Sequence, residues 1–489
     1  MFRRLPLPRP LPLSLFGLSL ALTACTAEEA PDAPPPRHVL LISLDTLRAD
    51  ATGFGGHDRP TTPFLDSLAE RGVVFENHFA NANCTLPSHA TMLTGLHYPA
   101  HGVWPDEDPE APIRVLPDSV VTVAERFQQG GYTTAAFTSH GAWLNEDYGF
   151  DQGFDHFLGR WADAEGILRK YIGMLEAEGV PERSFTFLHF FDVHSDHSPD
   201  GPCLPYEASP ELVAQFAGET PEGFTGCSRG PGLEGRCSST FLDDVSEGKE
   251  VLPEEHLTYL RGLYDAGIRQ LDDQLKLLFG ILEEKGLLDD TLIIVTSDHG
   301  ESFFEHRTML HDTHHDEVAR VPLFMVFPER FGVAPRRVQA ITQSTDLAPT
   351  LLELCGLEPV GQLPSLAGAI TSGAEPEDGF VLFNGHIVIG SDEEGPYKYV
   401  HAFGRRAPRA FYDRSLDPQE HNNLHASPAF VEENAARLAA VTERLETLLE
   451  ECKGINELLG EMGGATGDRL SPERILELKK LGYLGGEDG

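Results

Sequence analysis

Four short apolar runs, each followed by polar residues, limit the possible folds of this chain more than any other feature of its sequence. Segments with helical spacing separate the runs, and such alternation is typical of a mostly parallel sheet covered by helices. We therefore predict an α/β fold, with a mostly parallel central sheet and helices on both faces. The four predicted strands are residues 38–44, 132–138, 184–191 and 291–296.

The polar residues that follow these strands should lie close together, because open α/β sheets bind ligands at the carboxyl ends of their strands. Taken singly, each has an ordinary explanation, since an Asp after a strand can cap a helix and a histidine can lie on the surface. Asp, Thr and His side chains together form an oxygen-rich set with one imidazole, which suits a divalent cation. In chain order the strands deliver Asp45, His140, Asp192 with His194, and Asp298 with His299.

The overall charge excludes one class of partner. The 489 residues include 37 basic and 77 acidic side chains, which gives a formal net charge of −40. A charge of this sign repels nucleic acids and anionic membrane surfaces, so we expect no nucleic-acid partner. An anionic substrate would have to be attracted locally, by a metal ion or by the N-terminus of a helix.

The first residues are typical of an export signal. A basic start at Arg3 and Arg4 precedes an apolar stretch, residues 11–22, that is too short to span a bilayer. The stretch ends in Leu-Thr-Ala-Cys, which resembles the bacterial lipoprotein signal. We predict a signal peptide over residues 1–24, lipid on Cys25, and a Pro-rich tether over residues 25–37. The protein would then be exported and anchored to the bacterial cell envelope, facing the periplasm or the cell surface; the alternative is an ordinary secretory signal with an incidental cysteine.

The rest of the chain divides into a large and a small part. We predict a catalytic domain over residues 38–370, in which a Gly- and Pro-rich insertion at 198–253 faces the substrate. Three cysteines of the insertion are candidates for a disulfide, and the pairing stays open. Short strands and a helical segment predict a small antiparallel sheet subdomain over residues 371–489. The cysteines are Cys203, Cys227 and Cys237; the strands are residues 380–383, 387–389 and 397–401, and the helix is 430–449.

One segment, "NANCTLPSHATMLTG" at residues 81–95, is suited to present a nucleophile to an anion. Cys84 and Thr85 stand side by side just before a helix that starts at a proline and ends at a glycine. From the residues alone, either side chain could carry the chemistry.

Nine segments, in order, resemble the sulfatase family of the alkaline phosphatase superfamily. The resemblance extends from about residue 38 into the C-terminal part and implies an alkaline-phosphatase-like fold. The segments are "SLDTLRAD", "TTPFLDSLAERGVVFENHFA", "TLPSHATMLTG", "HGV", "IIVTSDHGE", "RVPLF", "DLAPTLLELCG", "YDRSLDPQEHNNL" and "LKKLGYL".

The resemblance implies a nucleophile, with one departure from the family. The family signature is Cys-x-Pro-Ser-Arg, and its Cys becomes formylglycine. Pro87 and Ser88 fix the register here, so Thr85 takes the place of that Cys, and His89 takes the place of the Arg. We therefore expect no formylglycine, and we interpret Cys84 as a small residue beside the site.

The other site residues follow from the same resemblance. The family's ligand positions fall on Asp45, Thr85, Asp298 and His299, and Thr46 stands where the family has a second Asp. With His299 in place of the family's Asn, the set has one more imidazole and one carboxylate fewer than usual. One divalent ion is expected, with Mn²⁺ or Zn²⁺ favoured and Ca²⁺ or Mg²⁺ possible; a second ion is the less favoured alternative. The catalytic set would be Thr85, His89, His194 and His311, with either of the last two as proton donor, and His140 and Asp192 would bind substrate.

The implied function is metal-dependent hydrolysis of a sulfuric or phosphoric ester. A phosphorylated Thr can be hydrolysed at phosphorus, whereas a sulfated Thr lacks the aldehyde exit of formylglycine, so Thr85 favours phosphorus while the overall resemblance favours sulfate. The substrate would be an anionic small molecule, glycan or lipid ester. Two alternatives stay open: a phospho-group transferase that uses the same Thr, and a glycan-binding lipoprotein without activity.

Overall fold

The computed structural model describes residues 34–104, 114–139, 143–195, 205–206, 208–224, 238–362, 365–401 and 409–461. The predicted signal peptide, the lipid site Cys25, the candidate His140 and the cysteines at 203, 227 and 237 lie outside these ranges. In the described ranges we find no helix that is both long and apolar enough to cross a membrane.

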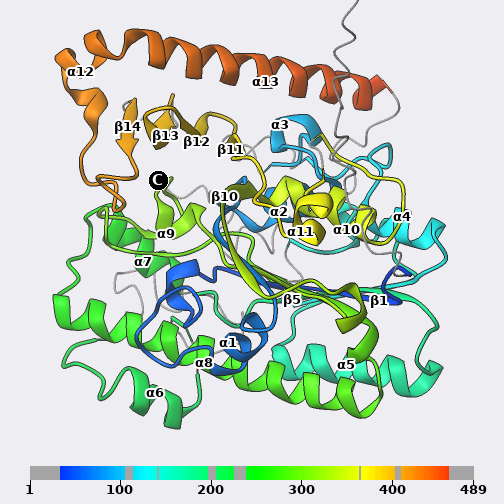
Figure 1. Cartoon of the computed structure of the whole chain (residues 1–489). Coiled ribbons are helices and arrows are strands. Elements are labelled where there is room, and N and C mark those ends of the chain that lie inside the picture. Colours follow the sequence, from blue (N-terminus) through cyan, green and yellow to red (C-terminus); the bar gives the residue numbers. More distant parts are fainter. Residues whose placement is uncertain are drawn as a thin grey trace, which may run out of the picture.

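An eight-stranded sheet forms the centre of the molecule (Figure 1). Its order is β10-β2-β9-β6-β1-β5-β3-β4, and only β9 runs antiparallel to its neighbours among these strands. The predicted fold class is therefore confirmed, and β1 and β6 have the predicted bounds. The strands are β1 His38–Leu44, β2 Val73–Phe79, β3 Thr133–Thr138, β4 His156–Gly159, β5 Ser184–Phe190, β6 Thr291–Thr296, β9 Leu323–Val326 and β10 Arg336–Gln343.

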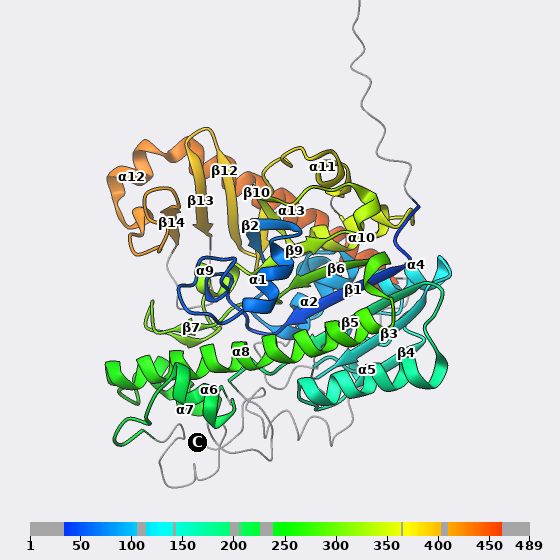
Figure 2. The same ribbon diagram turned by 60° about the horizontal axis from the view of Figure 1, so that its bottom comes forward.

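Both faces of the sheet are covered by helices, because its central strands are apolar on both sides. In β1, Val39 and Leu41 pack toward one face, whereas Leu40, Ile42 and Leu44 pack toward the other. Figure 2 shows α8 and α5 stacked below the sheet. The first face carries α2 Thr85–Thr94, α4 Val123–Gln129, α10 Leu347–Leu354 and α11 Ala367–Ser372; the second carries α1 Pro63–Ala69, α5 Ala164–Glu178 and α8 Glu254–Glu284.

Shorter elements complete the main body. Part of the predicted insertion is described and forms α6 (Pro210–Phe216), which packs on α8, and α7 (Ser238–Ser246). That the insertion faces the substrate stays a prediction, as do the domain limits. The remaining elements are α3 Tyr98–His101, α9 Asp316–Ala319, and a hairpin of β7 Ser302–Phe303 with β8 Met309–Leu310.

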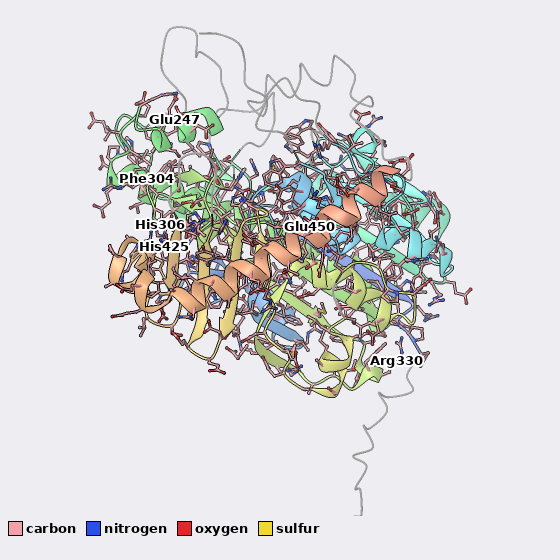
Figure 3. All side chains as sticks on the ribbon, turned by 90° about the horizontal axis from the view of Figure 1, so that it is seen from above. Glu247, Phe304, His306, Arg330, His425 and Glu450 are labelled. Atoms are coloured by element: carbon pink, nitrogen blue, oxygen red, sulfur yellow. The ribbon has the colours of Figure 1, made fainter. Side chains whose placement is uncertain are left out.

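A separate antiparallel sheet follows near the C-terminus, in the order β11-β12-β13-β14. One of its faces packs on the main body through residues such as Phe383 and Ile387, and the other packs against Leu438 and Leu445 of α13. Figure 3 shows α13 lying across the strands of this sheet and continuing beyond it. The fourth strand and the break between the two helices were not predicted. The elements are β11 Val381–Phe383, β12 Ile387–Asp392, β13 Gly395–Val400, β14 Ala410–Asp413, α12 Pro428–Glu433 and α13 Ala435–Glu461.

The end of α2 depends on a glycine. Gly95 adopts φ 67°, and a Cβ at this position would lie 3.0 Å from the Cα of Gly361. We expect Gly95→Ala to lower the free energy of unfolding by about 1 to 3 kcal/mol, because the left-handed backbone and the close approach both disfavour a side chain. Urea unfolding followed by circular dichroism measures this change.

A matched control is Gly280→Ala, in the interior of α8, where a Cβ would meet nothing within 4 Å. This substitution should raise the free energy of unfolding by about 0.5 to 1 kcal/mol, because Ala favours helix more than Gly does. Equal effects of the two substitutions would contradict the role given to Gly95.

Candidate active site

The predicted nucleophile lies at the first position of α2. Cys84 is the N-cap residue, with an extended backbone, and Thr85 opens the helix, two residues earlier than the proline start that the sequence predicts. The Oγ1 of Thr85 donates to Oδ2 of Asp45 over 3.3 Å. Thr85 therefore combines the positive end of a ten-residue helix with a hydrogen bond to a carboxylate.

Cys84 has the opposite character. Burial raises the pKa of its thiol to about 12. Since the thiolate is the nucleophilic form of cysteine, this side chain is a poor nucleophile at neutral pH.

Three of the predicted metal ligands meet at one point. Asp45 follows β1, while Asp298 and His299 follow the adjacent parallel strand β6. Each offers one ligand atom, and these atoms all lie within 4.8 Å of one another. All three side chains are buried.

The buried carboxylates of Asp45 and Asp298 favour binding of a cation. Burial raises the pKa of Asp45 well above its usual value, and the neighbouring charge of Asp298 raises it further. Burial also raises the pKa of Asp298, although His89 acts in the opposite direction. Two carboxylates this close, and this far from water, are stable as anions only beside positive charge.

The atoms that face one another fit a divalent ion. Oδ1 of Asp45, Oδ2 of Asp298 and Nε2 of His299 have no hydrogen-bond partner among the described residues. Nδ1 of His299 lies 3.0 Å from the carbonyl of Gly300, so it carries the proton and leaves the lone pair on Nε2. Because burial lowers the pKa of His299 to about 4, the ring is neutral at pH 7 and able to coordinate a metal.

His89 contacts Thr85, Asp298 and Ser43. Its Nδ1 lies 2.8 Å from the backbone carbonyl of Thr85 and 3.6 Å from Oδ2 of Asp298, and its Nε2 lies 2.9 Å from Oγ of Ser43. Since the Thr85 carbonyl can only accept, Nδ1 donates to it. Burial lowers the pKa of His89, which favours the neutral ring, in which Nε2 accepts from the serine. Both nitrogens thus contact protein groups, and the catalytic role expected for His89 stays a prediction.

The two candidate proton donors lie close to each other, and His311 lies beside the predicted metal ligand His299. The ring centroid of His311 is 4.5 Å from that of His299, and His194 lies 5.9 Å from His311. His194 in turn stacks on Phe191 at 4.1 Å. Burial and, to a smaller extent, the nearby His299 lower the pKa of His311 to about 3, so His311 is neutral in the free protein at pH 7.

Asp192, expected to bind substrate, has a role in the fold. Its Oδ1 accepts the backbone N–H of Ala164, at the start of α5, over 2.8 Å. At least one carboxylate oxygen of Asp192 therefore holds the helix to the end of β5.

The sequence reading missed two residues of the site. His189, inside β5, places Nε2 3.1 Å from Oδ2 of Asp45, and its ring meets that of His89 edge to face at 4.8 Å. A single imidazole in the apolar run "SFTFLHFF" was the available signal. Thr46 adopts φ 57°, which strains a β-branched residue, and it is held there because its N–H donates to Asp298 and its carbonyl accepts from Tyr264.

The chain is similar to several known proteins. A family model described as Sulfatase matches residues 37–172 and 162–357. The chain is 25% identical to a multifunctional alkaline phosphatase superfamily protein, PehA, of Trinickia caryophylli, over 81% of this chain and 92% of that protein. It is 25% identical to an ulvan-active sulfatase of Formosa agariphila, over 98% of this chain and 91% of that protein.

A solved structure has the same fold. The phosphonate monoester hydrolase of Agrobacterium radiobacter superimposes with a TM-score of 0.61 at 23% identity, covering 85% of this chain and 96% of that one.

Proposed function

Because this chain belongs to the sulfatase family and is thereby an ester hydrolase, we propose that Thr85 is its nucleophile and that its substrates are phosphoric or phosphonic esters. The observation that carries this proposal is the placement of the Thr85 hydroxyl. It opens α2 and donates to Asp45, one of three side chains whose ligand atoms lie within 4.8 Å of one another.

Asp45, Asp298 and His299 would hold one divalent cation, with Thr85 as a further ligand. Bound there, the cation would offset the charge of the ester's non-bridging oxygens and lower the pKa of the Thr85 hydroxyl. Two carboxylates with one imidazole favour Mn²⁺ or Zn²⁺ over Ca²⁺.

The residues of the chain then divide the reaction into two displacements. The proton of Thr85 passes to Oδ2 of Asp45, and Oγ1 attacks phosphorus, so that an O–P bond to Thr85 forms as the bond to the leaving alcohol breaks. His194 or His311 gives a proton to the leaving oxygen. Water next attacks phosphorus while the neutral histidine takes a proton from it. The bond between Oγ1 and phosphorus breaks, and the proton held by Asp45 returns to Oγ1 of Thr85.

The candidate proton donor must be protonated when the substrate binds. His311 is neutral in the free protein because its pKa is lowered to about 3. The negative charge of a bound ester raises the pKa of a nearby imidazole, so the donor acquires its proton as the ester enters.

Thr85 itself favours phosphorus over sulfur. Formylglycine can expel sulfate by collapse of its hydrate to an aldehyde, and a Thr ester has no corresponding route. Hydrolysis of phosphorylated Thr85 needs only a second attack at phosphorus.

A second candidate function is hydrolysis of a sulfate ester on an anionic glycan. The observation that favours it is the match to the ulvan-active sulfatase, which extends over 98% of this chain.

A comparison of substrates separates the two. Aryl phosphate, aryl phosphodiester, aryl phosphonate and aryl sulfate would be assayed in parallel with Mn²⁺, Zn²⁺ and Ca²⁺. We expect kcat/KM for the best phosphorus ester with Mn²⁺ or Zn²⁺ to exceed that for aryl sulfate by at least about 100-fold. Thr85→Ala protein, purified identically, corrects for contaminating phosphatases; turnover of sulfate alone, dependent on Ca²⁺, would overturn the proposal.

A further inference from the structure

The loop that leads to the nucleophile is bound by the C-terminal sheet. Asn384, in the turn between β11 and β12, accepts the backbone N–H of Asn83 on its Oδ1 over 3.1 Å, across 301 residues of sequence. Its own N–H donates to the carbonyl of Asn81 over 2.9 Å, and the Asn81 amide donates to the carbonyl of Leu382 over 3.0 Å. Three hydrogen bonds therefore fix the residues just before Cys84 and Thr85.

The loop that carries His311 is bound by the same sheet. Lys398 of β13 is fully buried, and its Nζ donates to the carbonyl of His314 over 2.9 Å and to Asp316 over 2.7 Å. It also pairs with Glu420 at 2.6 Å, and Glu420 in turn accepts the N–H of Asp316 over 3.1 Å. Charged hydrogen bonds in a buried place are short and directional, so they fix this loop closely.

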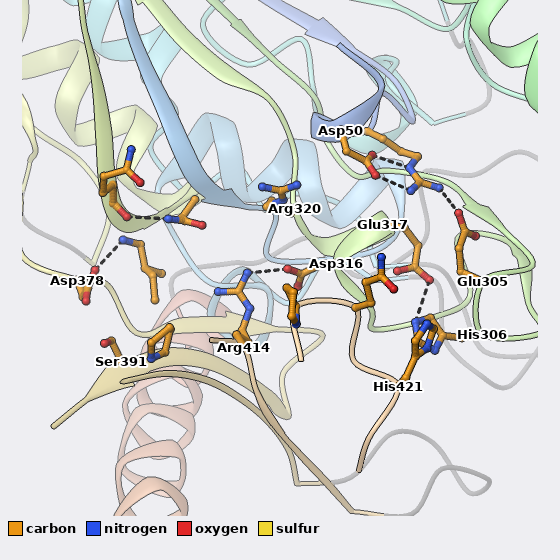
Figure 4. Close-up of a pocket in the computed structure, with 17 residues that line it drawn as sticks. Asp50, Glu305, His306, Asp316, Glu317, Arg320, Asp378, Ser391, Arg414 and His421 are labelled. Carbon is orange, nitrogen blue, oxygen red and sulfur yellow. Dashed lines mark hydrogen bonds and ion pairs between the residues drawn. The ribbon is translucent and has the colours of Figure 1, made fainter. Parts of the chain in front are cut away.

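Asp316 forms a further ion pair with an arginine of the C-terminal part. Arg414, just after β14, binds Asp316 over 2.6 Å. Both residues line a cavity of about 640 Å³ between the C-terminal sheet and strands β2 and β10, where Figure 4 shows them paired. Asp316 is therefore held both by a residue of β13 and by the residue that follows β14.

Asn83 joins the two loops. Its backbone is held by Asn384, and its side-chain amide donates to the carbonyl of His311 over 2.8 Å. A displacement of either loop would thus change the distance between the Thr85 hydroxyl and the His311 ring.

We propose that Asn384 and Lys398 are positioning residues, through which the C-terminal sheet holds the nucleophile loop and the His311 loop in register. This proposal rests on the proposed function in assigning Thr85 and His311 to catalysis. Neither positioning residue touches the ligand atoms of the triad in the contacts found among the described residues. Their contribution to the rate would therefore come from geometry, which affects kcat more than KM.

The test compares Asn384→Gly with Asn384→Asp. Asn384 adopts φ 49°, which Gly accepts without strain, so Asn384→Gly removes the side-chain acceptor and keeps the turn. We expect kcat to fall at least about tenfold with KM changed less than about twofold, because positioning is lost while binding groups remain. Asn384→Asp keeps an acceptor oxygen and should restore kcat to within about threefold of wild type.

Hydrogen–deuterium exchange gives a readout that does not depend on activity. In Asn384→Gly, residues 81–84 should exchange at least about tenfold faster, while in Lys398→Gln the increase should be confined to residues 311–316. A matched control is Asn423→Ala, since Oδ1 of Asn423 accepts the N–H of Phe411 over 3.1 Å within the C-terminal part. The control should lower the Tm without changing kcat or exchange in either loop.

The outcomes separate the two proposals. If wild type hydrolyses no ester while exchange responds as expected, the proposed function fails and the positioning by the C-terminal sheet stands. Unchanged kcat and unchanged exchange in Asn384→Gly, or a loss of kcat that Asn384→Asp does not restore, would overturn the positioning role.

Discussion

Thr85→Ala should reduce kcat at least about 1,000-fold, because it removes the hydroxyl that we propose as the nucleophile and leaves only binding and electrostatic contributions. Cys84→Ala, one residue away, should keep kcat within about threefold of wild type, since the high pKa of its thiol makes it a poor nucleophile. The measurement is steady-state hydrolysis of the best ester from the substrate comparison, after metal loading. The pair is a matched test, because both residues lie at the N-terminus of α2.

Two further experiments test whether Thr85 acts as the nucleophile. Thr85→Ser keeps the hydroxyl and should retain at least about 1% of wild-type kcat, whereas an equal loss in Ser and Ala variants would point to a packing effect. Mass spectrometry should find residue Cys84 as an unmodified thiol or a disulfide. An aldehyde at Cys84, or loss of activity in Cys84→Ala alone, would contradict the assignment of Thr85.

Removal of the metal should have the second largest effect. We expect inductively coupled plasma mass spectrometry to find about one divalent ion per chain in wild type and less than about 0.1 ion per chain in Asp298→Ala. The substitution removes one of the three predicted ligands whose atoms lie close together. Activity should fall at least about 100-fold with a chelator and return with Mn²⁺ or Zn²⁺. In wild type the Tm should rise with metal concentration, because binding to the native state stabilises it, and in Asp298→Ala it should not.

The control for this experiment is His78→Gln. His78 is also fully buried, with its pKa lowered to about 3 by burial. Its Nδ1 contacts Thr342 on β10, and β9 separates its own strand, β2, from β6 and β1, which precede the triad. This variant should lose stability and keep its metal. Full metal content in Asp298→Ala would show that the ion is bound elsewhere.

The metal-free protein should also respond to pH in a defined direction. The pKa values of Asp45 and Asp298 are raised in the folded chain, so these groups favour the folded state at low pH, and this contribution is lost as pH rises through the folded pKa values. Metal binding stabilises the two carboxylates as anions and should remove this loss. A comparison of Tm against pH with and without Mn²⁺ measures the difference.

Local patterns predicted much of the central sheet. β1 and β6 begin and end at the predicted residues, and β3 and β5 each differ by one residue at one end. These strands are buried on both faces, so their apolar runs are continuous and their limits sharp. The fourth strand of the C-terminal sheet, Ala410–Asp413, is short and ends in a polar residue. It was not predicted, because its position depends on pairing with β13.

By itself the sequence predicted which polar residues follow the strands, and the spacing to Pro87 and Ser88 favoured Thr85 over Cys84 as the nucleophile. Both depend on neighbours along the chain, where alternation, turn residues and motif spacing act over a few residues. Only the tertiary structure placed His189 against Asp45, turned His89 toward the Thr85 carbonyl, and brought Asn384 to Asn83 across 301 residues. Such contacts arise where strands and loops that are far apart in the sequence pack together. They depend on the free energy of tertiary packing, which the local sequence around each residue does not reveal.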